Sequence, residues 1–297
     1  MKTQSDAWYS VILLTFVTLL WTVAGAVWVL ADTDQRKPDV LSIGGSVTEI
    51  VYALDQQHRL VARDTTSVFP DSVVELPNVG YMRALSPEGV LAVEPGLIIS
   101  EDGAGPPETI DVLKAAAIPF VTIPDAYSSA GIVAKIEAVG RALDVEDKAH
   151  SLAQSVADEL AKAEARSSEV VTPKRVMFIL STQGGRILAS GTNTAADGII
   201  RLAGGVNAVS EFEGYKPLTD EAIGAAAPDV ILMMDRGADA TGGHSSADEE
   251  LFAMPALIPT PAAQNKSIVR MDGLYMLGFG PRTASAVSDL NTALYGG

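Results

Sequence analysis

Short apolar segments alternate with amphipathic ones along most of the chain. The segment 40–43 is apolar and partly β-branched, which is typical of a strand buried inside a sheet. Helical patterns separate such segments, and strands that alternate with helices indicate a parallel sheet covered by helices. The sequence therefore predicts an α/β protein. The predicted strands are 40–43, 60–62, 97–99, 119–123, 175–180, 229–234 and 267–271, and the main predicted helices are 47–54, 108–117, 129–143, 145–168, 195–202 and 283–294.

One pattern, made of a helix cap, a short helix, a proline and an apolar triplet, occurs twice. Residues 85–99 align without a gap on residues 218–232, and a Gly-Tyr pair precedes each copy. In the first copy Ser86 is expected to cap the helix, and Pro87 takes its first position, where a missing N–H costs nothing. Two copies this far apart predict two similar lobes, because a solenoid repeat would have a much shorter period.

The longest uninterrupted helical pattern lies between the two copies. Apolar residues recur at helical spacing from Ala149 to Ala163, and Asp144 stands where a cap is expected. Such a helix would be about 35 Å long at 1.5 Å per residue. That length suits a strut between lobes, although an ordinary surface helix would carry the same stripe. The predicted organisation is two α/β lobes with parallel sheets, at 38–143 and 171–297, joined by one long α-helix at 144–170.

The N-terminus carries an export pattern. Residues 8–30 form an apolar run behind Lys2, and Val29 and Ala31 provide small residues at the −3 and −1 positions before Asp32. This pattern predicts a secretory signal at 1–31, cleaved after Ala31, and a short linker at 32–37. An uncleaved membrane anchor is the alternative, since the run is long enough to span a bilayer. Both interpretations place the remainder of the chain outside the cytoplasm, and we expect the periplasm.

Composition and charge exclude several classes of function. The net charge of −16 argues against nucleic acid as a partner. The absence of cysteine excludes disulfides, thiolate metal sites, thiol catalysis and a lipid-modified cysteine. The three histidines, His58, His150 and His244, have no metal-ligand spacing, and only His244, in a Gly-, Ala- and Ser-rich loop at 236–247, is a candidate for a cleft. Hydrolytic and zinc chemistry therefore have little support.

Tyr81 and Arg83 are the most informative pair for chemistry. In extended backbone, residues two apart point to the same side, so a phenol and a guanidinium would share one site. A neighbouring cation lowers the pKa of a phenol, and tyrosinate is a known type of haem ligand. Composition alone favours a simpler interpretation, in which Tyr81 is a half-buried loop aromatic and Arg83 a surface charge.

Four separated motifs, from about Pro38 to the C-terminus, resemble those of periplasmic haem-binding proteins of bacterial haem ABC importers. These proteins are class III substrate-binding proteins with a helical backbone. The resemblance implies a non-catalytic carrier made of two Rossmann-like lobes bridged by one long helix, with haem as its transported ligand in the cleft between the lobes. It further implies that Tyr81 is the axial ligand of the ferric haem iron, and that Arg83 hydrogen-bonds near the phenolate or haem. The motifs are 64–67, 79–91, 214–218 and 271–283.

Further pocket residues follow from this hypothesis. Helix N-termini suit propionate oxygens, and two are expected at Ser46 and Thr194, in capping boxes with Glu49 and Asp197. Some relatives add a histidine from the second lobe, but the corresponding loop at 190–194 has none. The remaining candidates are Lys216, which aligns with Arg83 in the repeat, and the aromatic or apolar Tyr215, Tyr275 and Met276, with core packing an equally good interpretation for Met276.

Glu88 and Glu221 begin matching helices in the two copies of the repeat. Favourable charge at a helix start explains them without any further role. In the wider family, an acid at this position on each lobe docks onto arginines of the permease. The resemblance therefore implies a dimeric ABC permease with its ATPase as partner, and we expect the carrier itself to be a monomer.

Three alternatives remain open from the sequence. A carrier of the same fold for a ferric siderophore or cobalamin is the nearest, but Tyr81 with Arg83 favours haem. A two-lobed α/β transferase would need a phosphate loop or a carboxylate–metal cluster, and neither is visible. If the N-terminus is not cleaved, the chain could be a membrane-tethered sensor domain.

Overall fold

The computed structural model of the protein describes residues 39–235 and 244–296. The predicted signal segment, 1–31, and the linker, 32–37, lie outside these residues. Within the described ranges, no helix is both long and apolar enough to cross a membrane.

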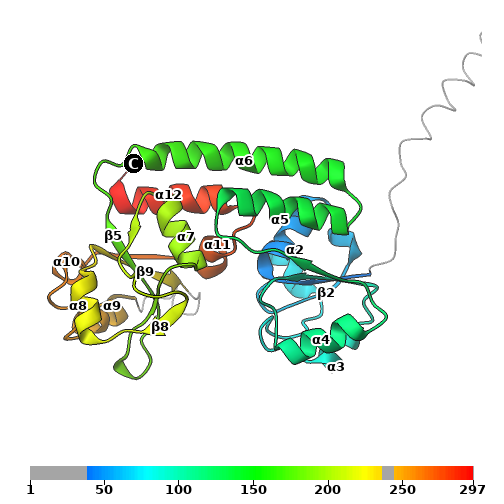
Figure 1. The fold of residues 1–297 in the computed structure, drawn as a ribbon, viewed down its shortest axis with the longest axis horizontal. Coiled ribbons are helices and arrows are strands. Elements are labelled where there is room, and N and C mark those ends of the chain that lie inside the picture. The colour runs from blue at the N-terminus through cyan, green and yellow to red at the C-terminus, as the bar shows by residue number, and fades with distance from the viewer. Residues whose placement is uncertain (1–38, 236–243, 297) are drawn as a thin grey trace, which may run out of the picture. The chain divides into compact units, whose positions relative to one another are not determined.

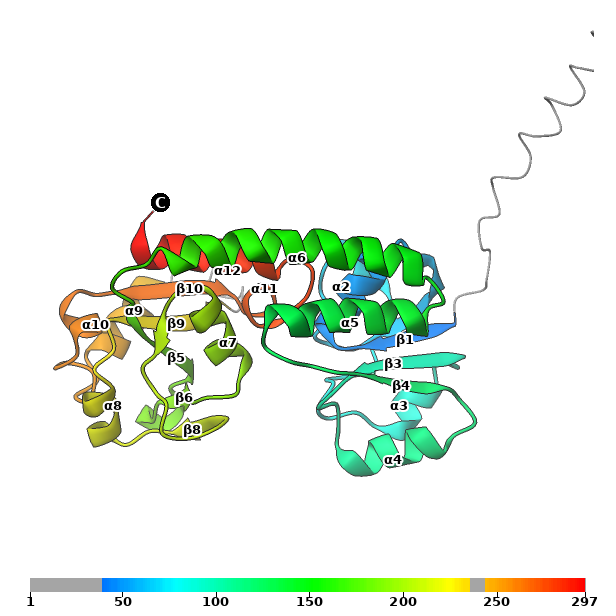
Figure 2. The same cartoon turned by 45° about the horizontal axis from the view of Figure 1, so that its top comes forward.

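The N-terminal lobe is built on a four-stranded parallel sheet in the order β2-β1-β3-β4. Alternate residues of each strand face opposite layers, since Val40 and Ile99 pack with one helical layer and Leu41 and Ile98 with the other. Helices α2 and α5 cover the first face, and α3 and α4 cover the second (Figure 2). The elements are β1 (Val40–Ile43), α2 (Gly45–Ala53), η1 (Gln57–Arg59), β2 (Leu60–Arg63), η2 (Asp71–Glu75), α3 (Pro87–Leu91), β3 (Leu97–Glu101), α4 (Pro107–Ala115), β4 (Phe120–Ile123) and α5 (Ser129–Ala142).

The C-terminal lobe is built on a mixed sheet in the order β10-β9-β5-β6-β8, with β7 paired to β5. Strands β10, β9, β5 and β7 are parallel, whereas β6 runs antiparallel to both of its neighbours, β5 and β8. Helices α7 and α12 cover one face, and α8, α9 and α10 the other. The elements are β5 (Arg175–Ser181), η3 (Gln183–Gly185), β6 (Leu188–Ser190), α7 (Ala195–Leu202), β7 (Val206–Asn207), β8 (Tyr215–Pro217), α8 (Asp220–Ala226), β9 (Val230–Asp235), α9 (His244–Phe252), α10 (Pro261–Gln264), β10 (Ile268–Asp272), α11 (Gly273–Leu277) and α12 (Thr283–Tyr295).

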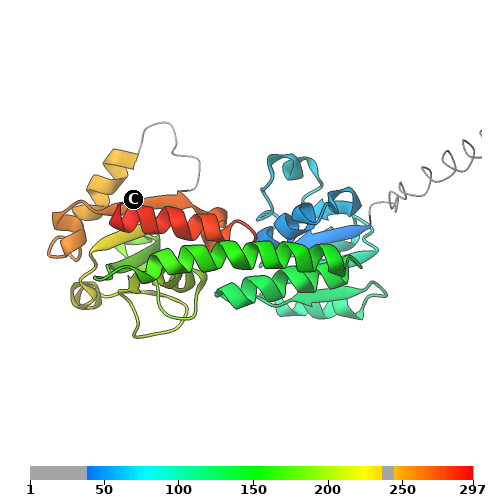
Figure 3. The same ribbon diagram turned by 90° about the horizontal axis from the view of Figure 1, so that it is seen from above.

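Helix α6 (Glu146–Ser168) connects the lobes and packs against α5 of one and α12 of the other (Figures 1 and 3). Its predicted apolar stripe from Ala149 to Ala163 is buried. A Cβ added to Gly140 of α5 would lie 2.1 Å from the Cβ of Ala149, so glycine permits this close helix crossing. The predicted cap is wrong: Val145 is the N-cap residue, and Asp144 has a left-handed backbone (φ 58°) one position earlier.

The predicted fold class is confirmed, with two α/β lobes and one long connecting helix. The strands β6 and β8, with antiparallel pairing of β6 to β5 and to β8, are an addition that the prediction of parallel sheets did not include. The predicted loop at 236–247 is wrong in part, because residues 244–247 belong to α9, while 236–243 and the side chain of His244 lie outside the described residues.

Candidate functional site

A cleft of about 740 Å³ lies between the two lobes. Strands β3, β9 and β10 all end at it, and their C-terminal residues Glu101, Asp235 and Asp272 line its wall. In open α/β sheets, ligands bind in the crevice beyond the carboxyl ends of the strands. Its volume is within the range of small-molecule and cofactor sites. The cleft is therefore the candidate ligand site.

Tyr81 and Arg83 both line this cleft, as predicted, but the geometric reason given for their pairing is wrong. The backbone from Tyr81 to Ala84 is a turn, closed by a hydrogen bond of 2.8 Å from the Ala84 N–H to the Tyr81 carbonyl. Tyr81 is 47% exposed. The loop before it is fixed, because the Thr65 N–H donates to the Gly80 carbonyl at 2.8 Å. The turn presents an accessible phenol on an anchored loop.

Arg83 is exposed and has no carboxylate partner among the described residues. Its charge reaches two other cleft tyrosines, Tyr127 and Tyr215, and opposes the rise of their pKa values. Burial outweighs this effect, so the pKa of Tyr215 is raised and that of Tyr127 rises to about 12. Burial, followed by a hydrogen bond to Asp289, raises the pKa of Tyr275 to about 12 as well. These three tyrosines are therefore neutral phenols at physiological pH.

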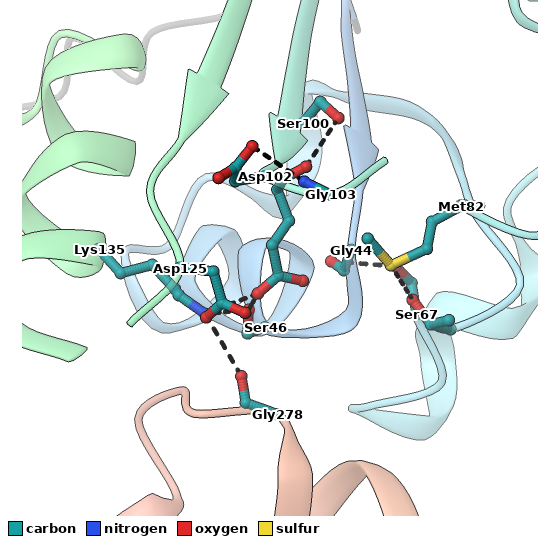
Figure 4. A network of polar contacts seen from close by, with 12 residues as sticks. Gly44, Ser46, Ser67, Met82, Ser100, Asp102, Gly103, Asp125, Lys135 and Gly278 are labelled. Carbon is teal, nitrogen blue, oxygen red and sulfur yellow. Dashed lines mark hydrogen bonds and ion pairs between the residues drawn. The ribbon is translucent and has the colours of Figure 1, made fainter. Parts of the chain in front are cut away.

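A buried charge network lies at the floor of the cleft (Figure 4). The Nζ of Lys135, on α5, donates to Glu101 Oε1 at 2.6 Å and to Asp125 Oδ1 at 2.7 Å. It also donates to Ser46 Oγ at 3.0 Å and to the Gly278 carbonyl of the other lobe at 3.4 Å. Burial raises the pKa of Glu101 most strongly, and the Lys135 charge opposes that rise. Sequence analysis missed this network, although a lysine within the apolar stripe of α5 was a visible signal.

Ser46 lines the cleft, but the capping box predicted for it is wrong. Gly44 is the N-cap residue, and its N–H donates to Asp64 Oδ1 at 3.0 Å. Ser46 instead donates its hydroxyl to Glu101 Oε1 at 2.6 Å, and Glu49 pairs with Arg282. A Cβ on Gly44, whose φ is 109°, would lie 2.5 Å from Glu101, so only glycine fits this turn. The hydroxyl of Ser46 is thus engaged within the protein.

Three predicted pocket residues do not line the cleft. Thr194 caps α7 as predicted, accepting from the Asp197 N–H at 3.0 Å, but it is buried and its hydroxyl contacts Ser190 Oγ at 2.5 Å. Lys216 is exposed on β8, and its Nζ lies 5.2 Å from the centroid of the Phe212 ring. Met276 is fully buried in the core. The lining of the described cleft therefore does not include Thr194, Lys216 or Met276, and their pocket roles stay predictions.

The remaining predicted residues, Tyr215 and Tyr275, do line the cleft. So do Phe69 and Arg282, which sequence analysis did not single out for the pocket. Arg282 lies over the Phe69 ring, with its Cζ 3.6 Å from the ring centroid. The cleft therefore has an aromatic wall as well as a charged floor.

Glu88 and Glu221 are exposed on corresponding short helices of the two lobes. The caps predicted by the repeat are confirmed, since Ser86 accepts from the Gly89 N–H at 3.0 Å and Thr219 from the Ala222 N–H at 3.2 Å. Hydrogen bonds from its own backbone N–H and from Thr219 lower the pKa of the Glu221 carboxyl. Neither acid lines the cleft.

The sequence model of the periplasmic binding protein family matches residues 40–274, and so spans both lobes and the connecting helix. The chain belongs to this family. Because the family consists of binding proteins, a carrier is confirmed and the two-lobed transferase is set aside. Among the described residues, no group of three or more His, Cys, Asp or Glu side chains could hold a metal ion.

Solved structures of the same fold include several periplasmic haem-binding proteins, among them BhuT and RhuT. BhuT, in complex with two haems, is 41% identical, with a TM-score of 0.80 over 86% of this chain and 97% of BhuT. RhuT from Roseiflexus sp. RS-1, in its apo form, is 36% identical, with a TM-score of 0.81 over 88% of this chain and 98% of RhuT.

Curated relatives are more distant in sequence. An uncharacterised ABC transporter substrate-binding lipoprotein, YvrC of Bacillus subtilis, is 26% identical over 89% of this chain and 82% of its own length. A vitamin B12-binding protein of Yersinia pestis is also 26% identical, over 78% of this chain and 80% of its own length. Both relatives match this chain over most of their own length.

Proposed function

We propose that the protein binds ferric haem in the interlobe cleft, with the Tyr81 phenolate as the protein ligand to the iron, and presents it to an ABC permease. One observation carries the proposal: Tyr81 is an accessible phenol on the cleft wall, on the same turn as a cation that no described carboxylate neutralises. Tyrosinate is a hard anionic donor that suits ferric haem. The structural relatives BhuT and RhuT, which are haem-binding proteins, support the same ligand class.

The other cleft tyrosines are poor competitors for the iron. Tyr127, Tyr215 and Tyr275 have raised pKa values, so each would have to lose a proton at higher cost before it could bind ferric iron. The hydroxyl of Tyr275 also donates to Asp289 Oδ2 at 2.9 Å. A second protein ligand from the 190–194 loop has no support, because that loop holds no histidine.

A ferric siderophore is a weaker candidate on charge. Pockets for these ligands use several cations, and of the two arginines that line the described part of the cleft, Arg282 is already paired with Glu49. Cobalamin is the second candidate, supported by the vitamin B12-binding relatives. It does not need a phenolate, so Tyr81 would then be a packing residue.

A calorimetric titration of the purified protein with haemin, cyanocobalamin and a ferric siderophore separates these candidates. We expect saturable binding of haemin at least about a hundredfold tighter than the other two ligands, a difference of about 2.8 kcal/mol. Tighter binding of cyanocobalamin would overturn the haem proposal and leave the carrier function in place.

For delivery, we propose that Glu88 and Glu221 dock onto a dimeric permease that works with its ATPase. The two acids are exposed at equivalent helix starts, one on each lobe, and a two-fold permease offers matched sites for such a pair. The double variant E88Q/E221Q should bind haem like the wild type but lower transport by about tenfold, the loss of about 1.4 kcal/mol of docking energy. Normal transport in a reconstituted assay would show that these acids act only on their own helices.

We also propose a periplasmic location for the mature chain, with the signal segment at 1–31 cleaved after Ala31. The linker is then 32–37, the N-terminal lobe 38–143, the connecting helix 144–170 and the C-terminal lobe 171–297. The apolar run at 8–30 and the family support export. Mass spectrometry of the mature N-terminus checks the cleavage, and an intact Met1 would favour a membrane-tethered protein. We further propose a monomer, and light scattering in solution checks it.

A further inference from the structure

One short segment of the C-terminal lobe, residues 278–282 between α11 and α12, reaches into the N-terminal lobe at the cleft floor; we call it the clasp segment. Its first residue, Gly278, accepts a hydrogen bond of 3.4 Å from Lys135 Nζ (Figure 4). Its second, Phe279, is fully buried and packs edge-on against Tyr127, with ring centroids 5.3 Å apart. A Cβ added to Gly280 would lie 3.5 Å from Glu49 Oε1, so the backbone passes close to α2.

The clasp segment ends in an ion pair between residues 233 positions apart in sequence. Arg282 donates its backbone N–H to Glu49 Oε1 at 3.1 Å and its Nε to Glu49 Oε2 at 2.9 Å. Its Nη2 lies 2.9 Å from Glu49 Oε2. The side chains of Arg282 and Glu49 are only 30% and 11% exposed. A charge-assisted contact that engages both carboxylate oxygens, one through the guanidinium and one through the backbone N–H, fixes orientation as well as distance.

The same guanidinium shapes the ligand wall. Its Cζ lies 3.6 Å from the centroid of the Phe69 ring, which belongs to the N-terminal lobe, and 5.2 Å from that of Tyr275, in the C-terminal lobe. All three side chains line the cleft. Because Glu49 engages the Nε, the Nη2 and the backbone N–H, the charge of Arg282 is compensated. Arg282 therefore differs from Arg83, which has no carboxylate partner in the described part of the chain and can meet an anionic group of a ligand.

We infer that Glu49 and Arg282 are a positioning pair: their contact across the lobes sets the width of the cleft and holds Phe69, Arg282 and Tyr275 together as one wall for the ligand ring. The connecting helix α6 runs along one side of both lobes, against α5 and α12. Contacts between the lobes at the cleft floor are therefore needed to fix how far the cleft opens. The role in cleft width stands without any ligand, whereas the role in ring packing rests on the proposed haem function.

The absence of cysteine makes the cleft width directly measurable. Spin labels at V112C on α4 and A225C on α8, both exposed, place one probe on each lobe. The parent is the labelled full chain that keeps Glu49 and Arg282. Without ligand, double electron–electron resonance on this parent should give one narrow distribution of distances between the labels. E49Q and R282Q should each broaden it. The double variant should be no broader than either single variant, because both remove the same contact.

R270Q is the matched control, because Arg270 pairs with Asp248 inside the C-terminal lobe at similar side-chain exposure. It should leave the interlobe distribution unchanged. E49Q keeps the shape of the glutamate side chain and removes its charge. Thermal unfolding of each variant shows whether the variant is folded. Distributions of folded E49Q and R282Q that match the parent would overturn the positioning role. Additive broadening in the double variant would show that the two residues do not act as a pair.

A haemin titration of the same variants tests the ring-packing part. The affinity of R282Q should fall by about tenfold, within the usual range of coupling between sites, while the iron–tyrosinate absorption band keeps its position. Unchanged affinity in R282Q would overturn this part alone. If the parent itself does not bind haemin, the haem proposal fails, and the distance measurement still decides the role in cleft width.

Discussion

The two copies of the sequence repeat agree in one part and differ in another. After Ser86 and Thr219 both copies form a capped helix, and both cap side chains accept a hydrogen bond from the N–H three residues later. Before these caps the copies diverge. Residues 81–84 form a turn at the cleft, whereas Tyr215–Pro217 form strand β8, which is antiparallel to β6.

This difference decides which side chains reach the ligand site. Arg83 lines the cleft, but Lys216, at the aligned position, lies outside it over Phe212. Capping acts over three or four residues and transfers with the sequence. The direction of a side chain depends on strand pairing, which residues far along the chain provide. A repeat therefore predicts equivalent helices more safely than equivalent ligand contacts.

The first prediction contrasts the two aligned cations. R83Q should raise the pH at which the tyrosinate–iron species forms by about one unit, because an opposite charge nearby favours the phenolate. K216Q should titrate like the wild type, since Lys216 does not line the cleft. A visible-absorption pH titration of both variants with bound haemin measures this. Equal shifts of this pH in the two variants would show that the two aligned cations act alike on the iron ligand.

The second prediction concerns the two caps that the copies share. S86A and T219A should each lower the free energy of unfolding by about 1 kcal/mol, because each removes the acceptor for one helix N–H. Urea unfolding measures both. A loss in only one variant would mean that the caps differ energetically despite their matching geometry.

The third and smallest effect concerns one half-exposed phenol on each side of the cleft. The pKa values of Tyr127 and Tyr275 are raised to about 12, so the folded protein holds these protons after the unfolded chain has lost them. The free energy of unfolding should therefore fall as pH rises from about 10 to 12. Each phenol should contribute less than about 1 kcal/mol to this fall, because solvent screens its charge. Chemical unfolding of Y127F and Y275F across this range should show a shallower slope than the wild type. An identical slope would show that neither phenol contributes to the pH dependence of the free energy of unfolding.

Local signals in the sequence predicted much of the fold. Periodicity predicted the strands and the buried stripe from Ala149 to Ala163, and cap spacing predicted Ser86 and Thr194. The same spacing failed at Ser46 and Glu49, because both side chains take distant charged partners instead of each other.

The site was less accessible to sequence reasoning. Tyr81 and Arg83 were predicted from their type and motif, although their backbone is a turn and not extended. Lys135 and Arg282 were missed as site residues, since their partners are 34 and 233 positions away. A buried lysine is marked only by its place in an apolar stripe, which shows that it needs a partner but not which one.

The central claim is that the Tyr81 oxygen binds the iron of ferric haem, and resonance Raman spectroscopy of the haemin complex tests it most directly. The wild type should show iron–tyrosinate bands that disappear in Y81F and persist in Y215F, the neighbouring tyrosine of the second copy. Loss of the bands only in Y81F is the predicted result. Tyrosinate bands that persist in Y81F, or a wild-type complex without them, would contradict the account.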